Sequence, residues 1–420
     1  MPRIVGATCL RAGLRGVGVA RAGRLAAALL WAVAGVEAAR ARTETQAHAA
    51  VAVDAGPLSN PNFTTTGMAT YDVDLDAPPR ERWTAAAKAI APGGLSAEIQ
   101  QYLANSTGLS MGELELVEKI TADLASSFGD ELAEELHGLA ETLDVDLGAL
   151  TIINLAYELR KLGGGRPNNT GTEHGACSGL VAADAQGNTF HARNLDWNIP
   201  AELYSLIFQC RFVRSGQPVF EGVCVLGTVG AYTGARAGVG AVNINERHLG
   251  GSVLSNLWSL VAHKAPPVAV ALRNVLEEST TFDAMYAALT NDPVTAPVYF
   301  IVSAPNVVGT RGMVLSRDRT KLDDVNAIDT GSGKWFVYES NYDRWTAPPR
   351  EDDRRRYALQ YIKALGQDDV ATQDGVLHIM DLWPIANACT SQTIFLNPND
   401  GTVVGYLRTF IGSPKCETQS

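Results

Sequence analysis

Apolar residues between Ser96 and Leu159 recur at three- and four-residue steps, with charged residues between them. Leu132, Leu136 and Leu139 illustrate this spacing. Because residues so spaced share one side of an α-helix, the segment is predicted to form consecutive amphipathic helices. Their apolar stripes are expected to pack against a sheet, and contact with a membrane is the alternative.

The pattern changes at Cys177 and becomes typical of β-strands, with short β-branched segments separated by glycine. Helical patterns lie between groups of these strands, at Val268–Glu277, Phe282–Leu289 and Arg355–Ala364. The chain is therefore predicted to have an α+β fold in which helices and sheets form layers. The predicted strands are Cys177–Ala182, Thr189–Leu195, Ser205–Val213, Val219–Val225, Val239–Ile244, Val298–Ser303 and Thr393–Leu396.

Composition narrows the class of protein. A chain of 420 residues with 46% hydrophobic content can bury one large core or two modest ones. The net charge of -11 argues against a nucleic-acid partner, because phosphate binding needs clustered Lys and Arg. The cysteines include no C-x-x-C pair, so no metal site is expected. They are Cys9, Cys177, Cys210, Cys224, Cys389 and Cys416.

The first 39 residues have the features of a secretory signal. Several arginines precede an apolar run at Leu25–Val36, which is too short for a standard membrane span. The Arg-rich start also suits an organelle transit peptide. Loss of Cys9 with this segment would leave an odd number of cysteines, so one thiol would stay free or pair outside the chain. Sequons for N-glycosylation favour secretion. They begin at Asn62, Asn105 and Asn168.

A hairpin is predicted around Asp184–Asn188, where turn-forming residues separate two strand-like runs. A turn centred on Gln186 and Gly187 would place Cys177 directly opposite Asp196. Their Cβ atoms would then be about 4.5–5.5 Å apart, so local geometry alone would bring a carboxylate beside the thiol.

The same register makes predictions for the other polar residues of the hairpin. Strict alternation would put Arg193 on the face opposite Cys177, and it could reach the thiol only through a bulge or break. His191 would also face away, which favours a structural role. The alternative is that Cys177 is an ordinary buried strand cysteine and Asp196 a turn residue.

The hairpin sequence resembles a known family. Cys177–Ala182, followed by His191–Asp196, looks like the segment that opens the β-subunit of acid ceramidases and N-acylethanolamine acid amidases. There a cysteine precedes a short apolar strand and a His-Gly-Arg-Asn-aliphatic-Asp run. Further similar motifs occur in the same order between Tyr71 and Leu407. They are Tyr157–Glu158, Asn245–Arg247, Ser316–Arg319, Asn341–Trp345 and Glu351–Arg355.

The resemblance implies an N-terminal-nucleophile (Ntn) hydrolase with an αββα sandwich. In this family the precursor cleaves before the cysteine, which here would give a helical α-chain of roughly residues 40–176 and a catalytic β-chain from 177 to 420. A nucleophile at a chain start carries its own base, because a free α-amine has a pKa of about 7.7–8.0. The two fragments would remain together as a heterodimer.

Six site residues follow from the resemblance. Cys177 would be the nucleophile, Arg193 would draw its thiol toward thiolate if it faces inward, and Asp196 would hold the new amine. Asn341 would donate to the tetrahedral oxyanion. Glu246 and Arg354 match positions in or around the family's active site, although each would otherwise be read as a solvated residue.

The chain departs from the family pattern at three places. The C-terminal cysteine pair of ceramidases is missing, with only Cys416 near the end. The family usually has Cys-Thr-Ser where this chain has Cys177, Ser178 and Gly179, a change that could loosen the start of the strand. A glycine-rich insertion from Lys161 to Gly175 also separates the Tyr-Glu motif from the scissile bond, and it predicts a surface loop. Autocleavage is therefore expected to be slower, or to need trimming by another protease.

The implied activity is hydrolysis of a fatty-acyl amide through a thioester at acidic pH, without a cofactor, in a lysosome or outside the cell. Asn245–Arg247 and Tyr342–Trp345 look more like ceramidases, whereas Ala347–Asp353 looks more like the acylethanolamine amidases. A lipid-binding protein that kept the fold without catalysis is an alternative. A cysteine amidase acting on bile-salt or penicillin-like amides is another.

Overall fold

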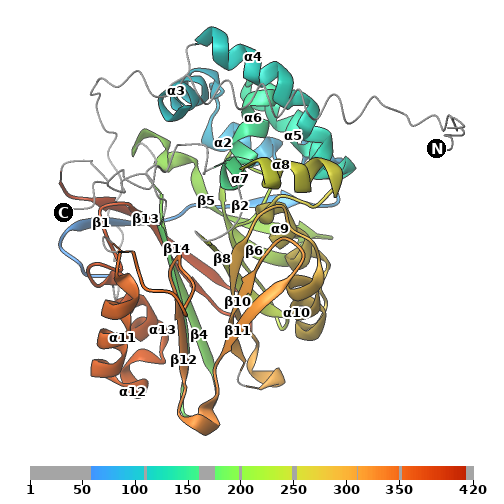
Figure 1. Ribbon diagram of the computed structural model, residues 1–420. Helices are drawn as coiled ribbons and strands as arrows, with labels where there is room; N and C mark the ends of the chain where they lie inside the picture. The colour runs from blue at the N-terminus through green and yellow to red at the C-terminus, as the bar shows by residue number, and fades with distance from the viewer. Residues whose placement is uncertain are drawn as a thin grey trace, which may run out of the picture.

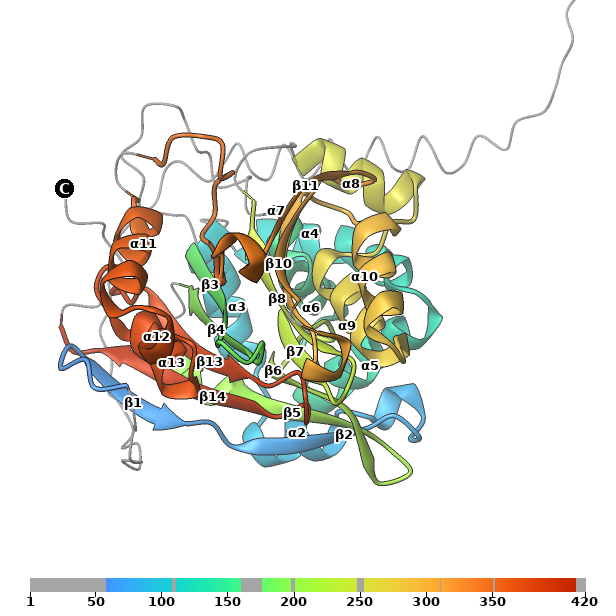
Figure 2. The same ribbon diagram turned by 90° about the horizontal axis from the view of Figure 1, so that it is seen from below.

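The computed structural model describes residues 58–107, 111–159, 176–197, 201–247, 253–309, 311–349 and 352–412. Two β-sheets lie face to face between layers of helices (Figures 1 and 2). The predicted α+β class and αββα sandwich are confirmed by this layering. The targeting segment with Cys9, the side chain of Asn105, the insertion with Asn168, and Cys416 lie outside the described residues.

The six-stranded sheet contains only antiparallel pairs and carries the predicted cysteine hairpin. Its N-terminal edge strand, β1, comes from the region before Cys177 and pairs with β14 near the end of the described chain. In spatial order the strands are β1 (Phe63–Gly67), β14 (Val403–Phe410), β13 (Thr390–Leu396), β4 (Thr189–Asp196), β3 (Ala176–Ala183) and β12 (Phe336–Glu339).

The eight-stranded sheet has one parallel pair, β2 with β5, and antiparallel pairs elsewhere. Its strand β2 also comes from the region before Cys177. In spatial order the strands are β11 (Leu322–Ala327), β10 (Gly312–Arg317), β9 (Val298–Ser303), β8 (Gly240–Glu246), β7 (Thr233–Arg236), β6 (Gln217–Val225), β5 (Ile207–Arg214) and β2 (Thr70–Asp74).

Helices cover the outer face of each sheet (Figure 2). α11 (Arg354–Leu365), α12 (Gln367–Val370) and α13 (Gln373–Asp381) lie on the six-stranded sheet. α9 (Val268–Glu278) and α10 (Phe282–Asn291) lie on the eight-stranded sheet, with α8 (Val253–Ala262) beside α7. Short 3-10 helices occur at Pro79–Glu81, Ala122–Phe128, Ala201–Leu206, Asn306–Val308 and Thr330–Ser332.

The predicted run of N-terminal helices is confirmed and gathers over one end of the sandwich (Figure 1). In α5, Leu132, Leu136 and Leu139 are buried, as their spacing predicts. Among the described residues, no helix combines the length and apolar character that crossing a membrane requires. The helices are α2 (Thr84–Ile90), α3 (Ser96–Thr107), α4 (Met111–Thr121), α5 (Asp130–Leu143), α6 (Leu147–Asn154) and α7 (Ala156–Leu159).

One buried core joins the N-terminal helices to the eight-stranded sheet and α9. At its centre the Glu135 carboxylate of α5 binds the guanidinium of Arg273 from α9 through two hydrogen bonds. Both side chains are fully buried. Arg82 and Trp83 donate to the same carboxylate at 2.9 and 2.7 Å. The regions before and after Cys177 therefore share a core and a buried ion pair.

Candidate active site

The hairpin of β3 and β4 has a different register from the predicted one. Ala176 pairs with Asp196, and Cys177 pairs with Leu195. The prediction that Cys177 lies directly opposite Asp196 is therefore wrong by one residue.

The turn explains this difference. The Asp184 carboxylate accepts hydrogen bonds from the backbone N–H groups of Gln186 and Asn188, at 2.9 and 2.8 Å. The Asp184 N–H in turn donates to the Asn188 carbonyl. These bonds close a five-residue loop between Ala183 and Thr189, whereas the prediction assumed a turn centred between two residues.

A shift of one residue in register moves each side chain of the shifted strand to the other face of the sheet. Cys177, Arg193 and Leu195 now share the face toward the eight-stranded sheet, while Asp196 lies on the face toward α11. Arg193 therefore faces inward without a bulge, so the prediction that it needed one is wrong. Asp196 acts on the other side of the Ala176–Cys177 peptide bond, since it pairs with Ala176 across the ladder.

His191 also lies on the same face as Cys177, so the prediction that it faces away from Cys177 is wrong. Its contacts are nevertheless structural. Its Nδ1 is 3.0 Å from Ser303 Oγ and its Nε2 is 2.8 Å from Asn243 Oδ1, between the two sheets. Burial lowers the pKa of His191 to about 4, which keeps the imidazole neutral at mildly acidic pH.

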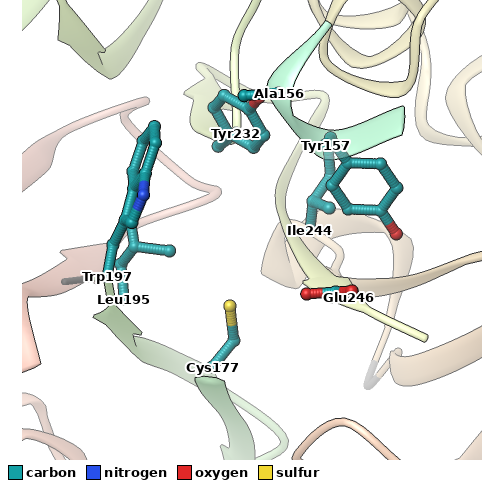
Figure 3. A pocket seen from close by; sticks show the side chains of 8 residues that line it. All are labelled: Ala156, Tyr157, Cys177, Leu195, Trp197, Tyr232, Ile244 and Glu246. Atoms are coloured by element: carbon teal, nitrogen blue, oxygen red, sulfur yellow. The ribbon is translucent and has the colours of Figure 1, made fainter. Parts of the chain in front are cut away.

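The sulfur of Cys177 points into a cavity between the two sheets (Figure 3). Among the described residues, Cys177 is the free cysteine, whereas Cys210 and Cys224 form a disulfide and Cys389 is also disulfide-bonded. The cavity volume is about 20 Å³, room for about one water molecule, so an acyl chain requires its walls to move. The lining residues are Ala156, Tyr157, Cys177, Leu195, Trp197, Tyr232, Ile244 and Glu246.

Arg193 lies beside the sulfur and is fully buried. It donates to Thr233 Oγ1 at 2.7 Å and to the Ile244 carbonyl at 3.4 Å, and it also interacts with the Cys177 side chain. Burial lowers the pKa of Arg193, and the charges of Cys177 and Asp196 oppose this effect. A guanidinium at this position stabilises the negative charge of a thiolate.

Asn341 holds the backbone at Cys177. Its Oδ1 accepts from the Cys177 N–H and from Arg354 Nη2, each at 2.8 Å. Its Nδ2 donates to the Glu246 carbonyl at 2.9 Å. These contacts fix the orientation of the amide, and the second N–H of Nδ2 can donate to a reacting oxygen. Glu246 thus joins the site twice, through its carbonyl and through its side chain, which extends toward the sulfur (Figure 3).

Arg354 connects the two faces of the hairpin. It begins α11 and donates through Nη1 to the Cys177 carbonyl at 2.8 Å and to Asp196 Oδ2 at 3.2 Å. Asp352 binds the same guanidinium at 2.6 and 2.7 Å. Burial alone would lower the pKa of Arg354, but Asp352 and Asp196 hold it above its ordinary value. The resemblance-based prediction of Arg354 thus falls on a residue in contact with the candidate nucleophile.

Sequence reasoning missed several side chains that hold this site. Thr390 and Asn387 bind Asp196, and Asp352 binds Arg354. Asp352 belongs to a motif noticed in the sequence, so it could have been found there. Asn387 and Thr390 are two polar residues three positions apart, and nothing in that pattern points to an aspartate some 190 residues earlier.

This arrangement suits acyl transfer. A sulfur nucleophile lies beside a buried cation, and the nitrogen of the same residue is held by Asn341. If the Ala176–Cys177 bond is cut, that nitrogen becomes an amine within reach of its own side chain, which can serve as the base. Among the described residues, no group of His, Cys, Asp and Glu is placed to hold a metal ion.

Comparison with known proteins agrees with the geometry. The chain is 30% identical over 356 residues to the acid ceramidase of Pan troglodytes, covering 80% of this chain and 85% of that protein. It is 29% identical over 343 residues to the N-acylethanolamine-hydrolyzing acid amidase of Rattus norvegicus, covering 81% and 89%. The chain belongs to the acid ceramidase and N-acylethanolamine acid amidase family.

A solved structure of a Caenorhabditis elegans N-acylethanolamine-hydrolyzing acid amidase ortholog is 28% identical. The match covers 53% of this chain and 93% of that chain, with a TM-score of 0.47. No family model matches the chain. The family resemblance read from the cysteine hairpin is confirmed by the two curated relatives.

Gly179, two residues after Cys177, packs closely against its neighbours. A Cβ at this position would lie 3.1 Å from Ile301 Cγ1 and 3.2 Å from Asn243 Oδ1, so these side chains fill the space. Ser178 keeps a hydroxyl, which lies 2.9 Å from the Tyr338 hydroxyl. The strand start is therefore packed and hydrogen-bonded.

Proposed function

We propose that this chain is a cysteine amidase that hydrolyses the N-acyl amide bond of ceramide or a related N-acyl lipid after cleaving itself before Cys177. The observation that carries the proposal is the Cys177 site: a free sulfur facing a pocket beside Arg193, with its own nitrogen bound to Asn341. The names of the curated relatives, acid ceramidase and N-acylethanolamine-hydrolyzing acid amidase, support it.

In the proposed reaction, the free α-amine of Cys177 takes the thiol proton and the thiolate adds to the carbonyl carbon of the amide. Negative charge gathers on the carbonyl oxygen, to which Asn341 Nδ2 donates, and Arg193 stabilises the sulfur. The amine leaves with the proton from the α-ammonium group. Water then hydrolyses the thioester, which releases the fatty acid and restores the thiol.

The remaining residues of the site position these groups. Arg354 holds the Cys177 carbonyl and Asn341, while Asp196 balances its charge and lies beside the position of the new amine. Glu246 is the one acidic side chain that lines the pocket among the described residues. Its carboxylate can accept a hydrogen bond from the substrate's N–H or hydroxyl group.

The fragments 40–176 and 177–420 would stay together as an α/β heterodimer. β1 and β2 belong to the first fragment and pair with β14 and β5 of the second. The shared core and the Glu135–Arg273 pair support the same conclusion.

Residues 1–39 are proposed to be a signal that sends the chain to a lysosome or out of the cell. The exposed Asn62 of the first sequon and the Cys210–Cys224 disulfide support an oxidising compartment.

Substrate choice rests on the pocket and the motifs. Aromatic and aliphatic walls from Tyr157, Trp197 and Tyr232 suit an apolar acyl chain. Ceramide is the proposed substrate class, and an N-acylethanolamine is the second candidate because the curated relatives include both kinds of enzyme.

Incubation of the purified chain at mildly acidic pH, followed by a denaturing gel and N-terminal sequencing, tests the proposal. Two fragments should appear, the larger beginning with Cys177, and ceramide and an N-acylethanolamine should be assayed side by side. Cys177→Ala should give neither fragments nor product. Fragmentation of Cys177→Ala before position 177, or binding of lipid without hydrolysis by the wild type, would contradict the proposal.

Glu158, Glu339 and His191 are buried titratable groups that make stability depend on pH. Burial raises the pKa of Glu158 to about 7 and of Glu339 to about 8, from 4.5. The contribution of these two glutamates to the free energy of unfolding is complete below pH 4.5. It is lost as the pH rises through the raised pKa values, because the folded chain then buries a charge. His191 acts in the opposite direction, since its contribution grows as the pH rises from about 4 to 6.5. The combined effect of the two glutamates on the free energy of unfolding is larger than the opposite effect of the histidine.

We therefore expect the folded chain to be more stable at mildly acidic pH than at pH 8, by a few kcal/mol. Glu339→Gln and Glu158→Gln should each flatten this dependence, whereas Glu98→Gln, on the surface, should not. Urea unfolding of each variant across this pH range, in the Cys177→Ala background to prevent cleavage, provides the measurement. Equal flattening by all three substitutions would contradict the assignment.

A further inference from the structure

Asp196 is fully buried and held by a turn that belongs to none of the motifs recognised in the sequence. Its Oδ1 accepts from Thr390 Oγ1 at 2.7 Å, and its Oδ2 accepts from Asn387 Nδ2 at 2.9 Å. Both residues come from the segment that enters β13, the strand beside β4. Together with Arg354, they supply three donors to one carboxylate.

The internal bonds of the turn fix the direction of these contacts. The Asn387 N–H donates to Thr390 Oγ1 at 2.9 Å, so the hydroxyl hydrogen of Thr390 is left to point at Asp196. The Cys389 N–H donates to Asn387 Oδ1 at 3.0 Å, so the Asn387 group aimed at Asp196 is its NH₂. Both side chains therefore present hydrogens to Asp196 and require an acceptor there, which matches an ionised carboxylate.

We propose that Thr390 and Asn387 are positioning residues that keep Asp196 ionised and oriented beside the Ala176–Cys177 bond. From there Asp196 binds Arg354, which contacts both the Cys177 carbonyl and Asn341. The inference rests on the proposed amidase function and deepens it, because it says which groups favour the charged form of Asp196 against its burial.

The surroundings of Asp196 make this role measurable. The pKa of Asp196 lies above its ordinary value because the effect of burial exceeds the opposing effects of Arg354, Thr390 and Asn387, and Asp352 raises it further. Arg193, on the same strand, also acts electrostatically on Asp196. Removing a donor that favours the charged form raises the pKa further. The carboxylate then takes up a proton at a higher pH.

Thr390→Val removes the hydroxyl and keeps the shape of the side chain. In the cleaved enzyme, we expect the acidic limb of kcat/KM to move up by about one pH unit, with about a tenfold loss of kcat/KM below it. Thr390→Ser should restore the wild-type limb. The matched control is Thr393→Val on the same strand, because Thr393 is equally buried but donates to Asn194 Oδ1 at 2.8 Å. Its limb should not move.

The outcomes separate the two proposals. A wild-type chain that neither cleaves itself nor hydrolyses N-acyl lipids overturns both. An active wild type with an unmoved acidic limb in Thr390→Val, or an equal movement in Thr393→Val, overturns only the positioning role. If Thr390→Val does not fold, Asn387→Ala removes the other donor and carries the same test. An upward movement of the acidic limb of kcat/KM in Asn387→Ala supports the positioning role, and a limb at the wild-type pH overturns it.

Discussion

Asn341→Ala is expected to lower kcat for amide hydrolysis by about 10²–10³-fold, the cost of losing one preorganised donor to an oxyanion. The side chain also holds the Cys177 N–H and Arg354 through Oδ1. Autocleavage should slow as well, because the nucleophile loses its backbone anchor. Steady-state kinetics on processed enzyme and the time course of fragment formation measure the two effects separately.

Asn341→Asp separates the two roles of this residue. Aspartate keeps an oxygen for the Cys177 N–H and for Arg354, but it cannot donate to the substrate. Cleaved Asn341→Asp enzyme should therefore be as slow as Asn341→Ala in hydrolysis, and it also loses the hydrogen bond from Nδ2 to the Glu246 carbonyl. Hydrolysis by either variant within about threefold of the wild type would show that the oxyanion is stabilised elsewhere.

The sequence predicts elements well where one periodicity dominates. The leucine spacing of α5 and the β-branched segments of β8 and β9 were recognised because their burial follows a single pattern. The edge strands β1 and β2 were missed, since each has five residues with few buried ones. β11 was also missed, because none of its residues is buried and two of them are aspartates.

The candidate site shows where local reasoning ends. The hairpin itself was predictable, but its register depended on Asp184 bonding to its own turn. A change of one residue then exchanged the faces of Arg193 and Asp196. Arg354 and Asn341 could be placed only by resemblance, because they reach Cys177 from positions more than 160 residues away.

The loss of Glu135 is expected to have the largest effect on stability. Glu135→Ala leaves the guanidinium of Arg273 fully buried without its carboxylate partner, and it also removes a partner of Arg82. Breaking such a pair from one side costs about 3–5 kcal/mol, because the remaining charge stays buried. Since Glu135 and Arg273 lie on opposite sides of the proposed cleavage site, a cleaved heterodimer should be affected most.

Urea unfolding of the Cys177→Ala background measures this loss in one chain, and size-exclusion chromatography of cleaved protein measures separation of the fragments. Glu134→Ala is the matched control, because Glu134 neighbours Glu135 but pairs with Arg80 on the surface and within the same fragment. It should change little, since exposed ion pairs contribute little.

A second substitution tests whether the unpaired charge is the cause. Adding Arg273→Met to Glu135→Ala removes the buried cation and keeps an apolar side chain of similar length, so part of the lost stability should return. The opposite outcome is a double variant that is less stable than Glu135→Ala, by as much as Arg273→Met alone destabilises the wild type. In that case Arg273 stabilises the fold through its stacking on Phe212 and its bond to the Val229 carbonyl. The ion pair would then be secondary to those contacts.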